Sequence, residues 1–337
     1  MDPIKKLTPY MDSYSREFAD SGNINWLPYT MYFHPFNYRS DVVNTDGSGF
    51  RYSMQRGQQY SVTDWNGIDV CRVIAGSSTA FGIGASADLH TLASRLSEHD
   101  SSGVPWMNFG GRSLNSTQEM ILFSLHRHQL PKVERVILLS GFNDLGLARL
   151  PKRLRMEHGA FFMCNEFFDA MRKKKQSRFS KWLNAGDARE SEDELPSLGE
   201  QIDYAVTLTL RNLANWHAMC VQMGAKLTFV LQPLANWVRK TGSPEEEILF
   251  LAREKQGGFA EQYGDILAHG AYVSYRDRLY EGAKALDVPF IDLTSHIRAA
   301  IADDFWLFVD RIHFTDQGHD VVSRLLVNLV NETEGSP

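Results

Sequence analysis

Five short apolar runs, separated by longer stretches of helical periodicity, constrain the fold of this chain most strongly. The runs are DVCRVIAG (69–76), VPWMNFGG (104–111), RVILLSGFND (135–144), AKLTFVLQP (225–233) and VPFIDL (288–293). Such runs are typical of strands buried on both faces of a parallel sheet. The helical stretches between them include residues 87–99, 116–130, 203–224 and 275–286. This alternation predicts an α/β fold with helices on both faces of the sheet. Ser116 or Thr117 is expected near the cap of the second helix.

Two segments lie outside this pattern. Residues 1–67 are rich in Tyr, Trp, Asn, Pro and Gly, with a turn at TDGSG (45–49). We expect an irregular β-containing N-terminal arm there, followed by the main domain over residues 68–337. Residues 151–200 change from basic to acidic. They fit either a solvated, mobile insertion or a lid, because they directly follow a candidate active-site strand.

Composition and motif spacing argue against several classes of protein. The formal net charge of −6 gives no general basic surface for nucleic acid. No run approaches about 18 uninterrupted apolar residues, so we expect no membrane span. The stretch MDPIKKLTPYMDSYSREF lacks the apolar region of a secretory signal. Three widely spaced cysteines, Cys71, Cys164 and Cys220, favour a reducing, cytoplasmic setting. Neither C-x-x-C nor H-E-x-x-H occurs, so we expect no metal and no cofactor.

Four stretches carry candidate chemistry, and each lies where a strand is expected to end. They are AGSSTAFGIG (75–84), NFGGRSLNS (108–116), SGFND (140–144) and DRIHFTDQGH (310–319). The carboxyl ends of parallel strands meet at one edge of a sheet, where functional residues collect. The first stretch would expose a serine hydroxyl beside the N–H groups of a helix start. Taken singly, each of the first three stretches also fits an ordinary turn.

The last stretch contains two Asp-x-x-His pairs. Asp310 precedes His313, and Asp316 precedes His319. An ionised Asp orients a histidine ring and stabilises its charged form, and such a histidine can activate a serine. Thr315 is expected to cap a helix, which would place the second pair in its first turn. We therefore favour Asp310 and His313, which precede that helix on a loop.

The order of these stretches resembles that of the SGNH (GDSL-type) hydrolase superfamily over residues 69–325. The family's nucleophile block is most often Gly-Asp-Ser, and here Ser77 stands in place of the Asp. The resemblance therefore implies that Ser78 is the nucleophile, with His313 as its base and Asp310 as the orienting carboxylate. It implies a flavodoxin-like three-layer αβα sandwich with a five-stranded parallel sheet.

The resemblance also implies an oxyanion hole. Its donors would be the backbone N–H of Ser78, one backbone N–H of the second stretch, and the side chain of Asn143. Counting forward from Asn108 identifies the second donor as Ser113, whereas matching the string Gly-Arg-Ser identifies it as Gly111. Both residues remain candidates.

The function expected from these features is hydrolysis of a carboxylic ester through an acyl-enzyme. The substrate expected is a small-molecule or glycan ester, with an acetyl or other short acyl group, and carbohydrate is one candidate alcohol. An acyltransferase would use the same residues, and a non-catalytic binding or regulatory protein on the same fold is the other alternative. The oligomeric state is left open. GFR at 49–51 precedes the nucleophile block in some members, so Arg51 either reaches the site or is an ordinary surface arginine.

Overall fold

The computed structural model of the chain describes residues 2–14, 25–27, 29–159, 195–257 and 259–335. Its centre is a five-stranded sheet in the order β6-β5-β7-β8-β9, with every neighbouring pair parallel. The strands are β5 (Val70–Gly76), β6 (Trp106–Gly110), β7 (Lys132–Ser140), β8 (Lys226–Leu231) and β9 (Phe290–Asp292). Numbered along the sheet, this order is 2-1-3-4-5, the flavodoxin-like arrangement. The expected fold class is therefore confirmed.

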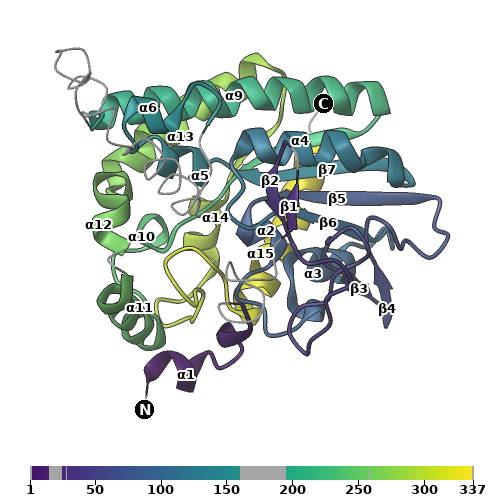
Figure 1. The fold of residues 1–337 in the computed structure, drawn as a ribbon, viewed down its shortest axis with the longest axis horizontal. Coiled ribbons are helices and arrows are strands. Elements are labelled where there is room, and N and C mark those ends of the chain that lie inside the picture. Colours follow the sequence, from purple (N-terminus) through teal and green to yellow (C-terminus); the bar gives the residue numbers. More distant parts are fainter. Residues whose placement is uncertain (1, 15–24, 28, 160–194, 258, 336–337) are drawn as a thin grey trace, which may run out of the picture.

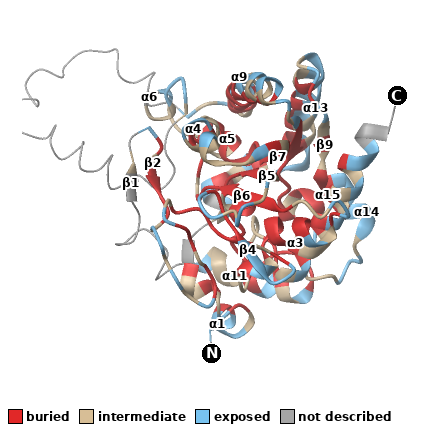
Figure 2. Cartoon of the chain, turned by 90° about the vertical axis from the view of Figure 1, so that its right-hand side faces the viewer, coloured by how far each residue is buried: buried red, intermediate tan, exposed pale blue. Residues whose placement is uncertain are grey.

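Helices cover both faces of the sheet and complete three layers (Figure 1). One face carries α4 (Ser116–His126), α9 (Leu198–Met223) and α13 (His269–Ala285). The other carries α3 (Leu92–His99), α14 (Leu293–Ala300) and α15 (Asp316–Gly335). Successive strand residues point to opposite faces, so Val73 and Ala75 join the first core while Ile74 joins the second. Figure 2 shows the buried residues concentrated between the sheet and its helices.

Further helical elements lie between these strands and helices along the chain. They are α2 (Ser78–Phe81), η2 (Asp88–His90), η3 (Arg127–Gln129), α5 (Phe142–Leu147), α6 (Lys152–Arg155), α10 (Ala235–Val238), α11 (Pro244–Gly257), α12 (Phe259–Tyr263) and η4 (Gly264–Leu267). Helix α4 is capped by Asn115, whose side chain accepts the N–H of Gln118 at 3.0 Å, and not by Ser116 or Thr117. The Gln118 side chain bonds back to the N–H of Asn115 at 3.0 Å and completes a capping box.

The N-terminal arm contains α1 (Pro3–Leu7) and two antiparallel strand pairs. The pairs are β1 (Asn25–Leu27) with β2 (Met31–Phe33), and β3 (Ser53–Gln55) with β4 (Gln58–Tyr60). Phe33, Phe50 and Tyr60 pack into the same core as the first face of the sheet. The arm therefore shares the apolar core of the larger unit.

The charged segment expected at 151–200 is described only in part. Residues 160–194 lie outside the described residues, so the choice between a lid and a solvated insertion stays a prediction. No helix within the described ranges is long and apolar enough to cross a membrane.

Candidate active site

Ser78 lies at the sharp turn between β5 and α2. Gly76 makes this turn with a φ of +151°, and a Cβ there would lie 2.1 Å from the carbonyl oxygen of Leu139. No side chain fits at that position, because real Cβ atoms never approach so closely. The Ser78 hydroxyl lies 2.8 Å from Nε2 of His313. Ser77 turns away and donates to Oε1 of Gln232 at 3.1 Å.

Asp310 holds His313 from the side opposite Ser78. Its Oδ2 lies 2.8 Å from Nδ1 of His313, and its Oδ1 accepts the backbone N–H groups of Ile312 and His313, each at 2.8 Å. Burial alone would raise the pKa of Asp310, but the charge and hydrogen bonds of His313 and the Ile312 N–H lower it to about 2. An ionised Asp310 can only accept, so Nδ1 of His313 carries the proton. Nε2 is then left to accept from the Ser78 hydroxyl.

The second Asp-x-x-His pair lies elsewhere. His319 is fully buried on α15 and packs edge-on against the ring of Phe314, 5.6 Å away. Burial lowers its pKa to about 3, so the ring is neutral. Asp316 accepts the backbone N–H and the hydroxyl of Ser86, at 2.8 and 2.5 Å. Thr315 caps α15 by accepting the N–H of Gly318 at 2.9 Å.

The second stretch forms a tight turn beside α2. Leu114 N–H donates to the carbonyl of Gly111 at 3.2 Å, and Ser113 has a φ of +55°. The N–H of Gly111 donates to the carbonyl of Gly76 at 3.0 Å, as the continuation of the β5–β6 ladder. This bond commits the Gly111 N–H to the main chain, which argues against Gly111 as an oxyanion donor. Just before this turn, Gly110 lies so close to α2 that a Cβ would fall 2.0 Å from the nitrogen of Phe81.

Asn143 is the second residue of α5, and the SGFND stretch therefore forms a helix start instead of an open loop. Its Nδ2 donates to the carbonyl of Leu114 at 2.6 Å. A side-chain amide carries two N–H groups, so one remains for a ligand oxygen. The same hydrogen bond joins α5 to the turn that contains Ser113.

A buried polar network behind Asn143 was not anticipated from the sequence. Asp144 accepts the Ser116 N–H at 3.0 Å and the Thr209 hydroxyl at 2.7 Å. It thereby ties the start of α5 to α4 and α9. Ser140 donates to Glu119 at 2.5 Å, and burial raises the pKa of Glu119 well above its usual value.

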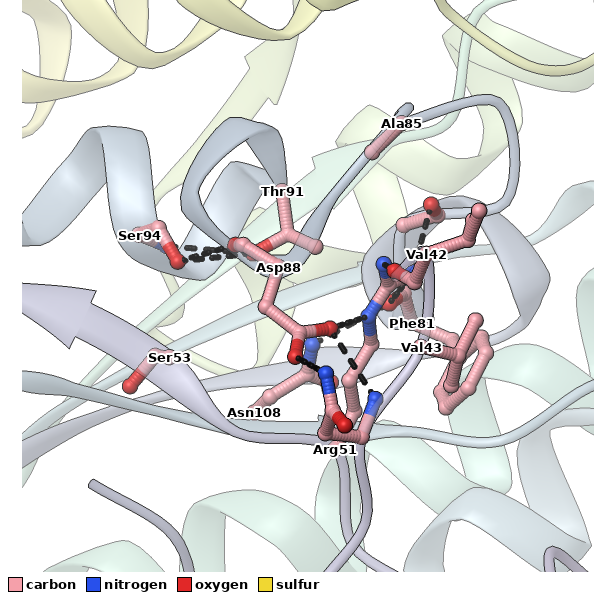
Figure 3. A network of polar contacts seen from close by, with 12 residues as sticks. Val42, Val43, Arg51, Ser53, Phe81, Ala85, Asp88, Thr91, Ser94 and Asn108 are labelled. Carbon is pink, nitrogen blue, oxygen red and sulfur yellow. Dashed lines mark hydrogen bonds and ion pairs between the residues drawn. The ribbon is translucent and has the colours of Figure 1, made fainter. Parts of the chain in front are cut away.

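Arg51 is fully buried, so it is not an ordinary surface arginine, and its hydrogen bonds go to residues other than Ser78. Figure 3 shows its guanidinium enclosed by the arm and by the segment after α2. Its partners are the carboxylate of Asp88 at 2.8 Å, the hydroxyl of Tyr14 at 2.8 Å, and the carbonyl oxygens of Val42 at 2.6 Å and Gly82 at 2.9 Å. Gly82 is the C-cap of α2, at the opposite end of that short helix from Ser78.

Two of the three cysteines can be placed. Cys71 and Cys220 are buried free thiols, and burial raises the pKa of each to about 12. Neither is therefore a reactive thiolate at neutral pH. Cys164 lies outside the described residues. Within the described ranges, no group of His, Cys, Asp and Glu side chains is arranged to hold a metal ion.

The chain is similar to solved lipases and acylhydrolases. A lipase/acylhydrolase from Enterococcus faecalis is 14% identical with a TM-score of 0.43, and the match covers 79% of this chain and 97% of that one. A GDSL-like lipase from Bacteroides thetaiotaomicron is 14% identical, with a TM-score of 0.40 and coverage of 79% and 89%. A carbohydrate acetylesterase from Sinorhizobium meliloti is 12% identical, with a TM-score of 0.41 and coverage of 78% and 99%. No protein-family model matches the sequence, and no curated protein matches it significantly.

Proposed function

We propose that this chain is a serine ester hydrolase of the SGNH type. The observation that carries the proposal is the continuous hydrogen-bonded chain from Asp310 through His313 to Ser78. A serine hydroxyl is a weak nucleophile until a neighbouring base removes its proton, and His313 lies at the distance this transfer needs. A binding protein on the same fold would not need these three side chains to lie within hydrogen-bonding distance of one another.

The proposed reaction has two halves. Ser78 Oγ attacks the ester carbonyl while His313 Nε2 takes its proton, and the tetrahedral intermediate then expels the alcohol, which receives that proton. Water attacks the acyl-enzyme with His313 again as base, and the acid leaves. The oxyanion in each half would be held by the N–H groups of Ser78 and Ser113 and by the side chain of Asn143.

The substrate we propose is an acetyl or short acyl ester of a small molecule or glycan. An alcohol that replaces water in the second half would make the same site an acyltransferase. The buried free thiols Cys71 and Cys220 are consistent with a reducing compartment, so we place the protein in the cytoplasm.

The nucleophile is tested by comparing Ser78→Ala with Ser77→Ala. We expect Ser78→Ala to lose p-nitrophenyl acetate hydrolysis and labelling by a fluorophosphonate, with turnover lowered roughly a millionfold. Ser77→Ala is the matched control, because the neighbouring hydroxyl faces Gln232, and it should still be labelled. Normal labelling of Ser78→Ala together with loss of labelling in Ser77→Ala would reassign the nucleophile. An unlabelled, inactive wild-type protein would overturn the proposed function.

A further inference from the structure

Two side chains of the N-terminal arm bind the turn that contains Ser113. The Tyr32 hydroxyl donates to the carbonyl of Arg112 at 2.9 Å. His34 Nε2 accepts the backbone N–H of Arg112 at 3.1 Å. Tyr32 and His34 are two residues apart on extended chain, so their side chains point the same way. Both are buried, at 7% and 2% exposure.

The Tyr32 contact bears directly on the candidate oxyanion donor. The carbonyl of Arg112 and the N–H of Ser113 belong to one peptide group. A trans peptide is planar, with its C=O and N–H pointing in opposite directions. A hydroxyl that fixes the Arg112 carbonyl on one side therefore also fixes the direction of the Ser113 N–H on the other.

The His34 contact fixes the peptide group between Gly111 and Arg112 in the same way, because His34 accepts its N–H. Nδ1 of His34 lies 3.1 Å from the carbonyl of Gly49, which can only accept, so Nδ1 carries the proton. Nε2 is then the acceptor that the Arg112 N–H requires. The ring is also packed between Phe33 and Phe81, with centroid distances of 4.4 and 4.1 Å.

The arm holds the nucleophile helix as well, since Arg51 bonds the Gly82 carbonyl at the end of α2. The arm thus contacts both the turn that contains Ser113 and the helix α2 that begins at Ser78. We propose that Tyr32 and His34 are positioning residues, which aim the Ser113 N–H at the oxyanion formed on the Ser78 ester adduct. This inference rests on the proposed esterase function and adds to it a role for the arm.

Tyr32→Phe is the direct test, because it removes one buried hydroxyl and keeps the ring. Complete loss of an oxyanion donor lowers turnover about 100- to 1000-fold, and a misdirected donor should lose part of that, about tenfold. We expect kcat for p-nitrophenyl acetate to fall about tenfold with KM changed less than about twofold, because the donor acts mainly in the transition state. Phenylboronic acid forms a tetrahedral serine adduct that places an oxygen in the oxyanion hole. Its inhibition should therefore weaken by a factor similar to the fall in kcat.

The matched control is Tyr60→Phe. Tyr60 is an equally buried tyrosine of the arm, at 6% exposure, and its hydroxyl donates to Gln58 at 2.6 Å, away from the turn. Its kcat should equal that of the wild type. Equal kcat values for Tyr32→Phe and Tyr60→Phe would overturn the positioning role while leaving the esterase intact. A raised KM at unchanged kcat would overturn it too. A wild-type protein without esterase activity or fluorophosphonate labelling would overturn the proposed function itself.

A second pair of variants covers the case in which Tyr32→Phe fails to fold. His34→Gln retains an oxygen that can accept the Arg112 N–H, whereas His34→Phe retains only the ring packing. We expect His34→Gln to keep several-fold more kcat than His34→Phe. Equal kcat values for these two would refute the positioning role.

Discussion

Replacing Asp310 with Asn should lower turnover strongly without unfolding the protein. Oδ1 of Asp310 accepts two backbone N–H groups, so the amide oxygen of an Asn will take that place. The amide NH₂ is then forced to face Nδ1 of His313, where a carboxylate oxygen lies now at 2.8 Å. Nδ1 must become the acceptor, and the ring proton moves to Nε2. The ring then presents an N–H to the Ser78 hydroxyl and no longer acts as its base.

The size of the effect follows from this tautomer change. Restoring the productive tautomer would break the new hydrogen bond and bring two N–H groups together. In the serine protease triad, the same Asp-to-Asn change costs about 10⁴ in turnover, which corresponds to about 5 kcal/mol of transition-state free energy. We expect a similar loss, because the distances on both sides of His313 are 2.8 Å.

The assay is p-nitrophenyl acetate hydrolysis at saturating substrate, between pH 6 and 8. The lowered pKa of Asp310, about 2, keeps the wild-type carboxylate charged throughout this range. Any stability gained from that ionisation is lost only as the pH falls below the ordinary value of about 4 and through 2. Asp316→Asn is the matched control, since Asp316 bonds Ser86, and its turnover should stay near wild type. A loss of less than about tenfold in Asp310→Asn would refute the tautomer reasoning and point to a Ser–His dyad.

Three further predictions test the remaining groups. Asn143→Ala should lower kcat about 100- to 1000-fold in the same assay, and an unchanged kcat with a raised KM would reassign Asn143 to substrate binding. His313→Ala should abolish activity, whereas His319→Ala should mainly lower the free energy of unfolding in urea, by about 2–4 kcal/mol for a large buried side chain. A fully active His313→Ala protein would refute the proposed base. Stability should also fall on acidification from about pH 6.5 to 3, by up to about 1.4 kcal/mol per pH unit for each of His34 and His319. Burial lowers both pKa values to about 3, so the unfolded chain binds protons in this range and the native chain does not. Urea unfolding at several pH values should show a flatter dependence for His319→Gln, and an identical slope would contradict this account.

The sheet could be predicted from the sequence because each strand is a short, mainly apolar run, separated from the next by a longer stretch that contains helical periodicity. The candidate site followed, since its residues lie at strand ends that the topology brings together. The cap of α4 lies one residue before Ser116, the first of the two residues expected near it. Asn115 is followed three residues later by Gln118 and Ser116 by Glu119, so the capping-box pattern fits both, and the folded structure uses Asn115.

Other features depend on contacts that no local pattern contains. The hydrogen bond from the Gly111 N–H to the Gly76 carbonyl follows from the register of β5 with β6. The contact of Tyr32 with Arg112 joins residues 80 positions apart. Arg51 is a charged residue whose burial depends on partners gathered from three separate segments. Tertiary packing decided each of these cases.

The sequence separation within the candidate triad also determines how long after Ser78 the ribosome adds His313. Ser78 and His313, joined by one hydrogen bond, are 235 positions apart. At about 5–20 residues per second, roughly 10 to 50 seconds separate the appearance of the nucleophile from that of its base. On the mechanism proposed above, a nascent chain carries an unactivated serine throughout this interval, and so does any chain truncated before His313. Fluorophosphonate labelling would then distinguish chains that extend past His313 from shorter ones, and hydrolysis would begin only after His313 has left the ribosome.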